Sequence, residues 1–384
     1  MAQRNPFEYG RELSTEELVD REDELQEIAA TIRNRAKLFL IGPRRFGKTS
    51  LLSVSHEAAA RRGITVLRLD AEKYETLDLL ASALLASATA SLKGGAERAM
   101  ETIRKVAARL RPQLSFDGES FHVSLAAGRT GEGDLPLLTD ALDAVERLAK
   151  ESQREVAVII DEVQHIVVEH GLTAERQLRS VVQRHRHVAY IFAGSSTRLL
   201  TQMTGDPDRP FYRLGSRLFL GPIPREDFRE FLMRRFQETG LRLTDEAVAA
   251  ILDGAEEVPY NVQRLAHATW ELAGPQAGTD IDAPLVTAAL RRIVLREDPA
   301  YTQLWTRLTT NQKKALKVVI RAGGIEVLAA EHTRALRIPS SSLRTAVQSL
   351  EDAHVVRVDA SMGQSRYRLV DPFLAEWLAV SQAT

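Results

Sequence analysis

The feature that most constrains the fold of this chain is the segment GPRRFGKTS, from Gly42 to Ser50. It matches the pattern G-x-x-x-x-G-K-[ST]. The apolar run 38–41 precedes it and Leu51 and Leu52 follow it, an order typical of a buried parallel strand, a loop and a helix. The first amides of such a helix lack partners within the helix, and the helix dipole makes that end positive. The segment therefore predicts a site for a polyphosphate.

Each position of this loop has a predicted role. Gly42 and Gly47 let the backbone approach the phosphates, Lys48 contacts the β and γ oxygens, and Thr49 offers a hydroxyl to Mg²⁺. We assign ATP or ADP to the whole run of Gly42, Pro43, Arg44, Arg45, Phe46, Gly47, Lys48, Thr49 and Ser50. The alternative interpretation is a glycine–lysine turn that arose by chance in a loop.

An acidic pair at the end of a second apolar run completes the expected site. Residues 155–162 read EVAVIIDE, with a strand predicted over 156–160. Asp161 follows at the carboxyl end, where open parallel sheets bind ligands, and we expect it to hold Mg²⁺. Glu162 is the predicted catalytic acid, which polarises the water that attacks the γ-phosphate. Alternatively, both acids only begin a helix, where they favour its dipole.

Composition narrows the class of protein. The 384 residues are enough for two or three domains, and 44% hydrophobic and 27% charged residues are ordinary for a globular chain. The absence of cysteine excludes disulfides, thiolate-held clusters and a cysteine nucleophile. No apolar stretch approaches a membrane span, so we expect a cytoplasmic protein without a membrane partner. A net charge of −1 means that any DNA contact needs a local basic patch.

The hydrophobic patterns predict an α/β fold with a doubly wound parallel sheet, followed by an α-helical lid and a winged helix. We divide the chain into an N-terminal arm (1–35), a P-loop core (36–222) with an insertion (76–130), the lid (223–298) and the winged helix-turn-helix (299–384). The core strands are expected at 38–41, 65–69, 156–160, 188–193 and 218–220. In the insertion we expect helices broken at Gly94 and Gly95, and a hairpin over 114–125 around Asp117 and Gly118.

The lid pattern contains three helical stretches, at 223–236, 244–255 and 258–274. Thr244 is placed to cap the second, and Pro259 suits the first turn of the third or the bend before it. We expect this piece to close over a nucleotide. The alternative is a plain helical subdomain.

The last segment predicts a helix over 301–322, a short helix over 332–336, a helix from Pro339 to Asp352, and strands at 355–358 and 366–370 around Ser361, Met362 and Gly363. This order is that of a winged helix. Residues 301–384 hold eleven basic and seven acidic residues, a balance that permits DNA binding without demanding it. On a duplex, Ser340, Ser341, Arg344, Thr345 and Gln348 would face the groove, and Arg366 and Arg368 would reach the backbone. The open alternative is a winged helix used for protein contacts or for packing on the core.

Further polar residues follow other strands of the core. Ser195 and Ser196 come after the strand at 188–193, where one hydroxyl can sense the γ-phosphate or hold the attacking water, or can instead cap the next helix. Arg209, Arg213 and Arg217 are candidates for an arginine that contacts a γ-phosphate in the same or a neighbouring subunit. Surface solvation is the alternative for each of them.

The motifs together resemble a known family. The succession NPFEYG, REDEL, GPRRFGKTSL, VIIDEVQ, FAGSS, RPFYR, LGPI, VPYNVQ and VDPFLAEW is similar to the archaeal-type ATPases and their bacterial relatives, a branch of the signal-transduction ATPases with numerous domains, close to the origin-recognition members of the AAA+ class. The resemblance covers nearly the whole chain. It implies that Lys48 and Thr49 bind phosphate and Mg²⁺, that Asp161 coordinates the metal, and that Glu162 is the catalytic acid. It also implies a sensor role for Ser195 or Ser196, makes Arg213 the arginine of the FYR motif, and assigns Pro259, Tyr260 and the segment from Asp20 and Arg21 to Glu22 to the nucleotide base. VPY replaces the glycine–proline pairing common in this lid.

From these residues we expect a Mg²⁺-dependent ATPase, slow or stimulated by a partner, that acts as a switch. ATP would close the lid and reposition the winged helix, in a DNA-associated, regulatory or defence role. One alternative is a DNA-stimulated oligomeric ATPase of the transposition or origin-recognition type. Another is a scaffold locked by nucleotide that binds a protein partner or a second copy of itself.

Overall fold

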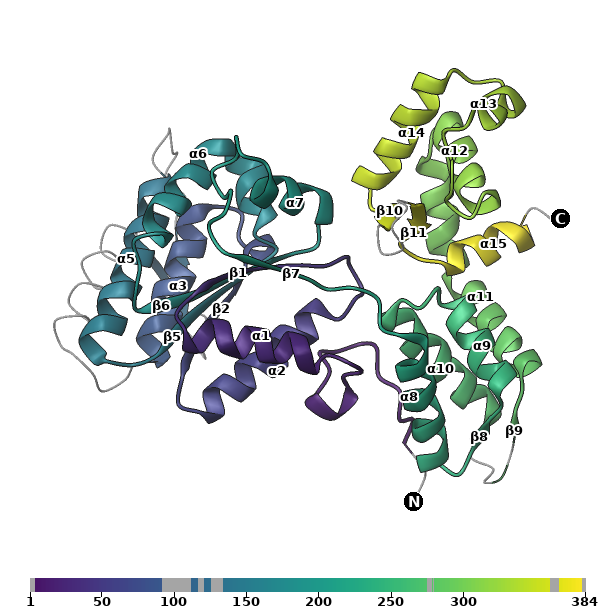
Figure 1. Cartoon of the computed structure of the whole chain (residues 1–384), viewed down its shortest axis with the longest axis horizontal. Helices are drawn as coiled ribbons and strands as arrows, with labels where there is room; N and C mark the ends of the chain where they lie inside the picture. The colour runs from purple at the N-terminus through teal and green to yellow at the C-terminus, as the bar shows by residue number, and fades with distance from the viewer. Residues whose placement is uncertain are drawn as a thin grey trace. The chain divides into compact units, whose positions relative to one another are not determined.

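The computed structural model in Figure 1 describes residues 4–91, 112–116, 121–125, 134–274, 278, 280–359 and 366–381. The chain divides into two compact units. Unit 1 comprises Met1–Asp20, Arg44–Gly47 and Gly221–Thr384, and unit 2 comprises Arg21–Pro43 and Lys48–Leu220. The tip of the phosphate loop, Arg44–Gly47, therefore belongs to unit 1, whereas the residues on both sides of it belong to unit 2.

Unit 2 is built on a five-stranded parallel sheet. Its strands are β1 (Lys37–Ile41), β2 (Thr65–Asp70), β5 (Val156–Asp161), β6 (Val188–Gly194) and β7 (Ser216–Phe219), in the spatial order β2-β5-β6-β1-β7. All five predicted core strands are confirmed. The order places the carboxyl ends of β1, β5 and β6 side by side, which is where the predicted polar residues follow their strands.

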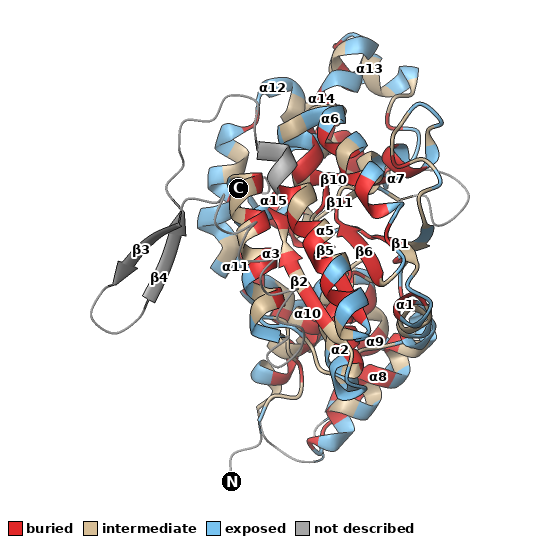
Figure 2. Cartoon of the chain, turned by 90° about the vertical axis from the view of Figure 1, so that its left-hand side faces the viewer, coloured by how far each residue is buried: buried red, intermediate tan, exposed pale blue. Residues whose placement is uncertain are grey.

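Helices cover both faces of this sheet. One face carries α1 (Glu22–Arg33) and α2 (Lys48–Arg61), and the other carries α3 (Leu77–Ser91), α5 (Asp134–Ser152), α6 (Gln164–Val182) and α7 (Thr197–Gly205) (Figure 1), and a short 3₁₀-helix, η2 (Ala71–Lys73), follows β2. Because both faces are covered, β5 and β6 are buried along their whole length (Figure 2). This explains why these strands read as continuous apolar runs in the sequence.

The insertion contains the predicted hairpin. Strands β3 (Pro112–Phe116) and β4 (Phe121–Leu125) pair antiparallel. Gly94, Gly95, Asp117 and Gly118, where we predicted breaks and a turn, lie outside the described residues.

Unit 1 contains the predicted lid helices. They are α8 (Arg225–Glu238), α9 (Asp245–Gly254) and α10 (Pro259–Ala273), and α11 (Ala283–Arg307) follows. The Thr244 hydroxyl accepts the N–H of Ala247 at 3.2 Å and Pro259 occupies the first turn of α10, so both boundary predictions are confirmed. The sequence pattern missed a short parallel pair, β8 (Arg242–Leu243) and β9 (Asp280–Ile281).

The winged helix consists of α12 (Thr310–Arg321), α13 (Ala330–Leu336), α14 (Ser340–Asp352), the antiparallel strands β10 (Val356–Asp359) and β11 (Arg366–Leu369), and α15 (Phe373–Ser381). The sequence analysis did not predict α15. The turn residues Ser361, Met362 and Gly363 lie outside the described residues.

One predicted helix, over 301–322, is wrong as a single element. It is the end of α11 and all of α12, separated at Leu308 and Thr309. Thr309 starts a new helix because its hydroxyl accepts the N–H of Gln312, whose side chain accepts the N–H of Thr309 in return. The boundary that we drew at Pro299 falls inside α11, which continues through that proline.

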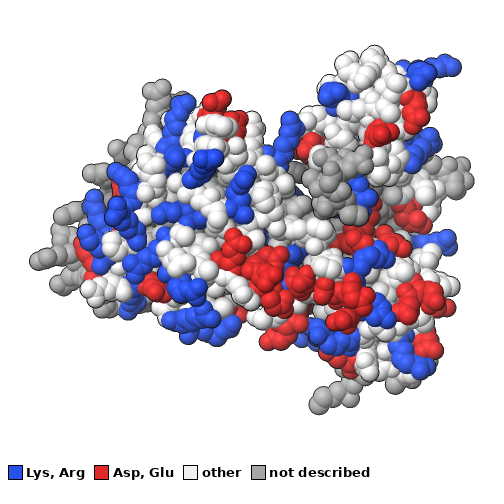
Figure 3. Space-filling model, viewed as in Figure 1, with Lys and Arg blue, Asp and Glu red and all other residues white. Residues whose placement is uncertain are grey.

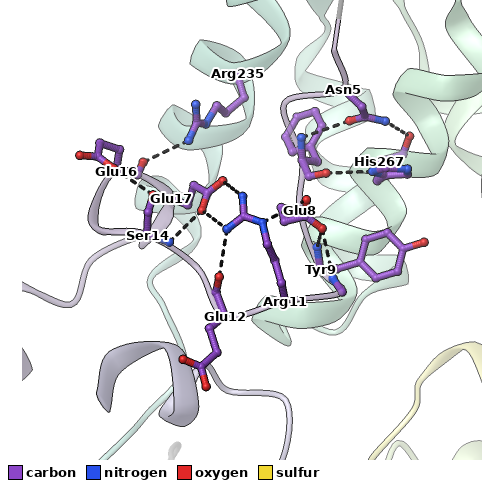
Figure 4. Close-up of polar contacts among 12 residues, drawn as sticks. Asn5, Glu8, Tyr9, Arg11, Glu12, Ser14, Glu16, Glu17, Arg235 and His267 are labelled. Carbon is purple, nitrogen blue, oxygen red and sulfur yellow. Dashed lines mark hydrogen bonds and ion pairs between the residues drawn. The ribbon is translucent and has the colours of Figure 1, made fainter. Parts of the chain in front are cut away.

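The N-terminal segment is part of unit 1. Figure 4 shows its polar contacts with Arg235 and His267. Phe7 is buried against Phe231 and Phe236, and its carbonyl oxygen lies 2.8 Å from Nδ1 of His267. Arg235 on α8 donates to the carbonyl of Glu16 at 3.1 Å, beside the short 3₁₀-helix η1 (Thr15–Glu17). These contacts hold the segment on α8 and α10. Within the described ranges, no helix combines the length and apolar character needed to cross a membrane.

Candidate functional site

Lys48 joins the two predicted motifs in unit 2. Its Nζ lies 3.1 Å from Oδ1 of Asp161 and 2.6 Å from Oε1 of Glu162, and all three side chains are largely buried. The backbone explains the approach: Gly47 adopts a φ of +85°, which directs the chain into α2, and Lys48 is the first residue of that helix. Side chains from both predicted motifs, Lys48, Asp161 and Glu162, therefore lie together in unit 2.

Glu162 is held on both of its oxygens. Oε1 accepts from Lys48, while Oε2 accepts the N–H of Ser195 at 3.0 Å and its hydroxyl at 2.9 Å. Burial alone would raise the pKa of Glu162, but the positive charge of Lys48 and the hydrogen bonds from Lys48, Gln164 and Ser195 bring it to about 2. Glu162 is therefore ionised at neutral pH. Its φ of +51° lies in the left-handed region, where non-glycine residues are uncommon and strained.

The sequence analysis left one neighbour of Glu162 without a role. Gln164, the first residue of α6, donates from Nε2 to Oε2 of Glu162, and Nε2 also lies 3.5 Å from the hydroxyl of Ser195. Its side chain is almost fully buried. The available signal was a long polar side chain in VIIDEVQ, directly after a buried strand.

Ser195, and not Ser196, belongs to this centre. Ser196 stands at the N-cap of α7 and makes no capping hydrogen bond with its side chain. Ser195 immediately follows β6, whose neighbour in the sheet is β5, and its hydroxyl consequently reaches Glu162. Of the two candidate serines, Ser195 is the one whose hydroxyl contacts Glu162.

Close backbone packing fixes the start of the phosphate loop. The N–H of Gly42 donates to the carbonyl of Gly194 at 3.3 Å. A Cβ added at Gly42 would lie 2.7 Å from Cβ of Leu220, closer than real Cβ contacts allow. Only glycine fits at this point, where the carboxyl ends of β1 and β6 meet.

The tip of the loop has its own set of partners in unit 1. The guanidinium of Arg45 pairs with Oδ2 of Asp371 at 3.1 Å, lies 3.4 Å from Oδ1 of Asn261, and stacks 5.1 Å over the ring of Tyr260. The N–H of Tyr260 donates to the carbonyl of Arg45 at 3.2 Å. Two of these partners begin α10, and Asp371 lies between β11 and α15.

Phe46 and Tyr9 extend this cluster. Phe46 is buried, and the guanidinium of Arg357 stacks over it, 4.9 Å from the centroid of the Phe46 ring. Tyr9 packs edge-on against Tyr260, with ring centroids 5.8 Å apart. We call Arg45, Phe46, Tyr260, Asn261, Arg357 and Asp371 the tip cluster. It joins the loop tip to the first turn of α10 and to the winged helix.

The other residues predicted to bind nucleotide lie outside both the Lys48 centre and the tip cluster. Arg21 is buried and pairs with Glu24 at 2.7 Å in unit 2, whereas Asp20 belongs to unit 1 and has a φ of +45°. Thr49 is exposed and Ser50 is buried, both in the first turn of α2.

The three candidate arginines differ from one another. Arg209 pairs with Glu175, whose side chain is completely buried, so its charge is committed within the fold. Arg213 stacks on Tyr212 at 5.0 Å and, with Arg217 and Thr204, lines a hollow of about 400 Å³. Within the part of the chain that the structure describes, Arg213 is not a hydrogen-bond partner of Lys48, Asp161 or Glu162.

The predicted DNA-contacting residues fall into two groups. Ser341 and Arg344 are exposed on α14, and Gln348 donates to Asp352 at 2.9 Å on the same helix. Arg368 pairs with Asp359 at 2.9 Å and with Glu256 at 3.1 Å, and Arg366 lies 3.8 Å from Asp359. On the face drawn in Figure 3, the winged helix carries separate basic and acidic side chains without a continuous basic band.

Comparison with known protein families identifies the chain's class. Residues 18–263 match the model of an ATPase domain predominantly from Archaea, which is more than half of the chain. The chain belongs to this ATPase family. Residues 299–380 match the model of a probable winged helix domain. The family shown here is the one that the motifs resemble, and its members hydrolyse ATP, so this chain is an ATPase. No curated protein sequence matches it.

Solved structures share the fold over nearly the whole length. The Walker-type ATPase of Pyrococcus abyssi has a TM-score of 0.65 at 16% identity, and the match covers 97% of this chain and 99% of that one. The ORC2 protein of Aeropyrum pernix, in ADPNP–ADP complexes, has a TM-score of 0.54 at 16% identity with 99% of both chains covered. The ORC1 protein of A. pernix, in complex with DNA, has a TM-score of 0.51 at 16% identity, with 96% and 95% covered. At this identity these likenesses show the fold alone.

Proposed function

We propose that this ATPase is a Mg²⁺-dependent switch in which the state of the bound nucleotide controls the winged helix. The observation that carries the proposal is the tip cluster, because it links the phosphate loop to the winged helix through the ion pair of Arg45 and Asp371. Gly47 of the tip and Lys48 of the catalytic centre are consecutive residues. A phosphate that moves Lys48 must therefore also act on the backbone of the tip.

We assign hydrolysis to the centre around Glu162. Its carboxylate is the group that would orient and polarise the attacking water. Lys48 now neutralises that carboxylate, and the same ammonium is the group that a γ-phosphate would bind. Binding of the polyphosphate would thus withdraw Lys48 from Glu162 and free Oε1, while Ser195 keeps its hold on Oε2.

The residues present fit a magnesium ion. Asp161 ends β5 with its carboxylate directed to the Lys48 centre, and Thr49 lies in the first turn of α2, so both supply the hard oxygen ligands that Mg²⁺ prefers. Among the described residues, no group of three or more His, Cys, Asp or Glu side chains could hold a metal without other ligands. Phosphate oxygens and water would have to complete the shell. A bound Mg²⁺ would neutralise charge on the phosphates.

Hydrogen exchange over residues 366–381 tests the switch directly. We expect exchange in this segment to differ between the nucleotide-free, ADP-bound and ATP-bound protein, because nucleotide acts on the tip and Asp371 lies in the segment. Asp371→Ala, which removes the ion pair from the side of the winged helix, should abolish the difference while ATP still binds. Arg225→Ala is the matched control, since Arg225 on α8 makes exposed ion pairs with Asp253 and Glu257 and has no contact with the loop tip. Identical exchange in all nucleotide states would contradict the proposal.

A second candidate function is binding of double-stranded DNA. It is favoured by the shared fold with the ORC1 protein that was solved with DNA, and by the exposure of Ser341 and Arg344 on α14. We place a phosphate contact at Arg344. Arg366 and Arg368 would have to give up their pairing with Asp359 to reach a duplex, so we expect a smaller contribution from them.

Fluorescence anisotropy with a labelled duplex, measured over a series of salt concentrations, tests this candidate. Arg344→Ala should lower the slope of log affinity against log salt by about 1, the loss of one phosphate contact. Arg234→Ala on α8 serves as a control with the same charge change. If the slope is unchanged, or if no duplex binds, protein contact or self-association becomes the better assignment for the winged helix.

The cytoplasmic location and the membership of the signal-transduction branch stay predictions.

A further inference from the structure

We propose that Gln164 is a positioning residue for ATP hydrolysis, which holds the Glu162 carboxylate so that Oε1 is the oxygen presented to the attacking water. The proposal rests on the assignment of Glu162 as the catalytic acid. It adds a role for a side chain on α6 that neither family match nor motif assigns.

The hydrogen bonds of Glu162 are divided unequally between its two oxygens. Three donors converge on Oε2, namely Nε2 of Gln164 and the N–H and hydroxyl of Ser195. A single donor, Nζ of Lys48, reaches Oε1. The three donors on Oε2 belong to the fold itself, at the ends of β5 and β6, whereas Lys48 is the donor for which a polyphosphate competes. When Lys48 moves to the phosphate, only Oε1 becomes available.

Chemistry fixes the orientation of the Gln164 amide. Oε2 of Glu162 accepts both the N–H and the hydroxyl of Ser195, so the Gln164 amide must direct its NH₂ group, and not its oxygen, to that acceptor. This orientation leaves Oε1 of Gln164 buried without a hydrogen-bond partner. A buried polar atom without a partner destabilises the folded state. Gln164 thus contacts Glu162 even though its own amide oxygen is left without a partner. This arrangement favours a functional role for Gln164 over a stabilising one.

The backbone of β6 makes room for this side chain. A Cβ added at Gly194 would lie 2.1 Å from Oε1 of Gln164, so the amide in this position occupies space that a side chain at residue 194 would take. Glu162 contributes from the other side through its left-handed φ of +51°. Two special backbone positions, one at the end of β6 and one after β5, thus bring Gln164, Glu162 and Ser195 together.

Gln164→Met tests the role because it keeps the length of the side chain and removes its donor. We expect kcat for ATP to fall by about 10- to 100-fold, the scale of a misplaced catalytic group, and the dissociation constant for a fluorescent ATP analogue to stay within about twofold. Gln164→Glu, of the same shape but with a carboxylate facing Glu162, should lower kcat at least as far. The control is Gln177→Met on the same helix, because Gln177 also has a buried amide oxygen without a partner and has no contact with Glu162.

The split between kcat and affinity decides the outcome. Turnover by Gln164→Met within about twofold of the unmodified protein would overturn the proposal. A parallel loss of ATP affinity or of thermal stability, beyond that of Gln177→Met, would mean that Gln164 acts only by packing and would also overturn it. Glu162→Gln is measured beside these variants: if it retains turnover, the catalytic acid itself is misassigned, whatever Gln164→Met does.

Discussion

The centre around Glu162 in unit 2 and the tip cluster in unit 1 are built on opposite principles. In the first, Lys48, Asp161 and Glu162 are largely buried and satisfy one another at distances down to 2.6 Å. In the second, Arg45 is about one-third exposed and divides its contacts among Asp371, Asn261 and the face of Tyr260. The first arrangement is closed and the second is open to exchange.

This difference teaches how a chain can combine a fixed catalytic geometry with a movable output. Removing one partner of a buried ion pair lowers the free energy of unfolding by several kcal/mol. The Lys48 centre therefore keeps its geometry until another anion takes the place of Glu162. Partly exposed pairs contribute only about 0–1 kcal/mol and can be exchanged at little cost. A contact of the second kind, on the same loop, suits the transmission of a change in nucleotide.

The largest effect is expected when the predicted catalytic group of the Lys48 centre, the carboxylate of Glu162, is replaced. Glu162→Gln should lower kcat by about 10²–10⁴-fold, because the amide cannot take a proton from the attacking water, while ATP remains bound. Steady-state phosphate release and binding of a fluorescent ATP analogue measure the two quantities. Glu155→Gln, at the exposed residue directly before β5, is the control. Retained turnover would move the base to another residue.

The buried ion pair of Arg209 and Glu175, also in unit 2, should likewise be costly to break. The free energy of unfolding measures this cost. Arg209→Ala leaves Glu175 buried without its cation, and we expect the free energy of unfolding to fall by about 3–5 kcal/mol. Urea denaturation measures it. Arg184→Ala, which removes an exposed pair with Asp143, should cost less than about 1 kcal/mol. Equal losses in both variants would remove the distinction between closed and open pairs.

Within the tip cluster the expected loss is smaller. Asp371→Ala removes the ion pair with Arg45, the acceptor for the Tyr301 hydroxyl at 3.2 Å and the acceptor for the N–H of Phe373 at 3.2 Å. We expect the free energy of unfolding to fall by about 1–2 kcal/mol, measured with urea. Asp253→Ala, which removes an exposed pair with Arg225, is the control. A loss as large as that of Arg209→Ala would show that the tip cluster is not open to exchange.

The smallest effect concerns acid stability. Burial alone would raise the pKa of Glu146, but hydrogen bonds from the N–H groups of Arg186 and His187 and from the His187 ring lower it below the usual range. A lowered pKa in the folded state stabilises the protein above the unfolded pKa of about 4.3, and this contribution is lost as pH falls through the folded pKa. Glu146→Gln should therefore cost about 1 kcal/mol at pH 7 and nothing at the acid end of that window. A cost independent of pH would contradict this assignment.

The sheet, and the residues that gather at the carboxyl ends of its strands, could be predicted from the sequence because both depend on local chemistry. Continuous apolar runs identified the five strands, and the glycine–lysine loop with the acidic pair identified Lys48, Asp161 and Glu162. The choice between Ser195 and Ser196 needed the pairing of β5 with β6, which no local pattern encodes. Gln164 was missed for the same reason, since its role depends on the space left by Gly194.

The tip cluster was beyond the reach of sequence reasoning. Arg45, Tyr260 and Asp371 are far apart in the chain, and a surface arginine, a lid tyrosine and an aspartate before a helix each have an ordinary local explanation. The break between α11 and α12 was missed because the apolar spacing continues across Leu308, and only the reciprocal bonds of Thr309 and Gln312 reveal a new start.

Intrinsic tryptophan fluorescence during an ATP titration tests the central claim most directly. The three tryptophans, Trp270, Trp305 and Trp377, all belong to unit 1, whereas Lys48 and Glu162 belong to unit 2. The account predicts that ATP changes the emission of the unmodified protein, and that Lys48→Ala abolishes the change by preventing binding. Asp371→Ala, which removes the ion pair from the side of the winged helix, should bind ATP with little change in emission. Full ATP binding without any change in the emission of the unmodified protein, or an undiminished change in Asp371→Ala, would contradict it.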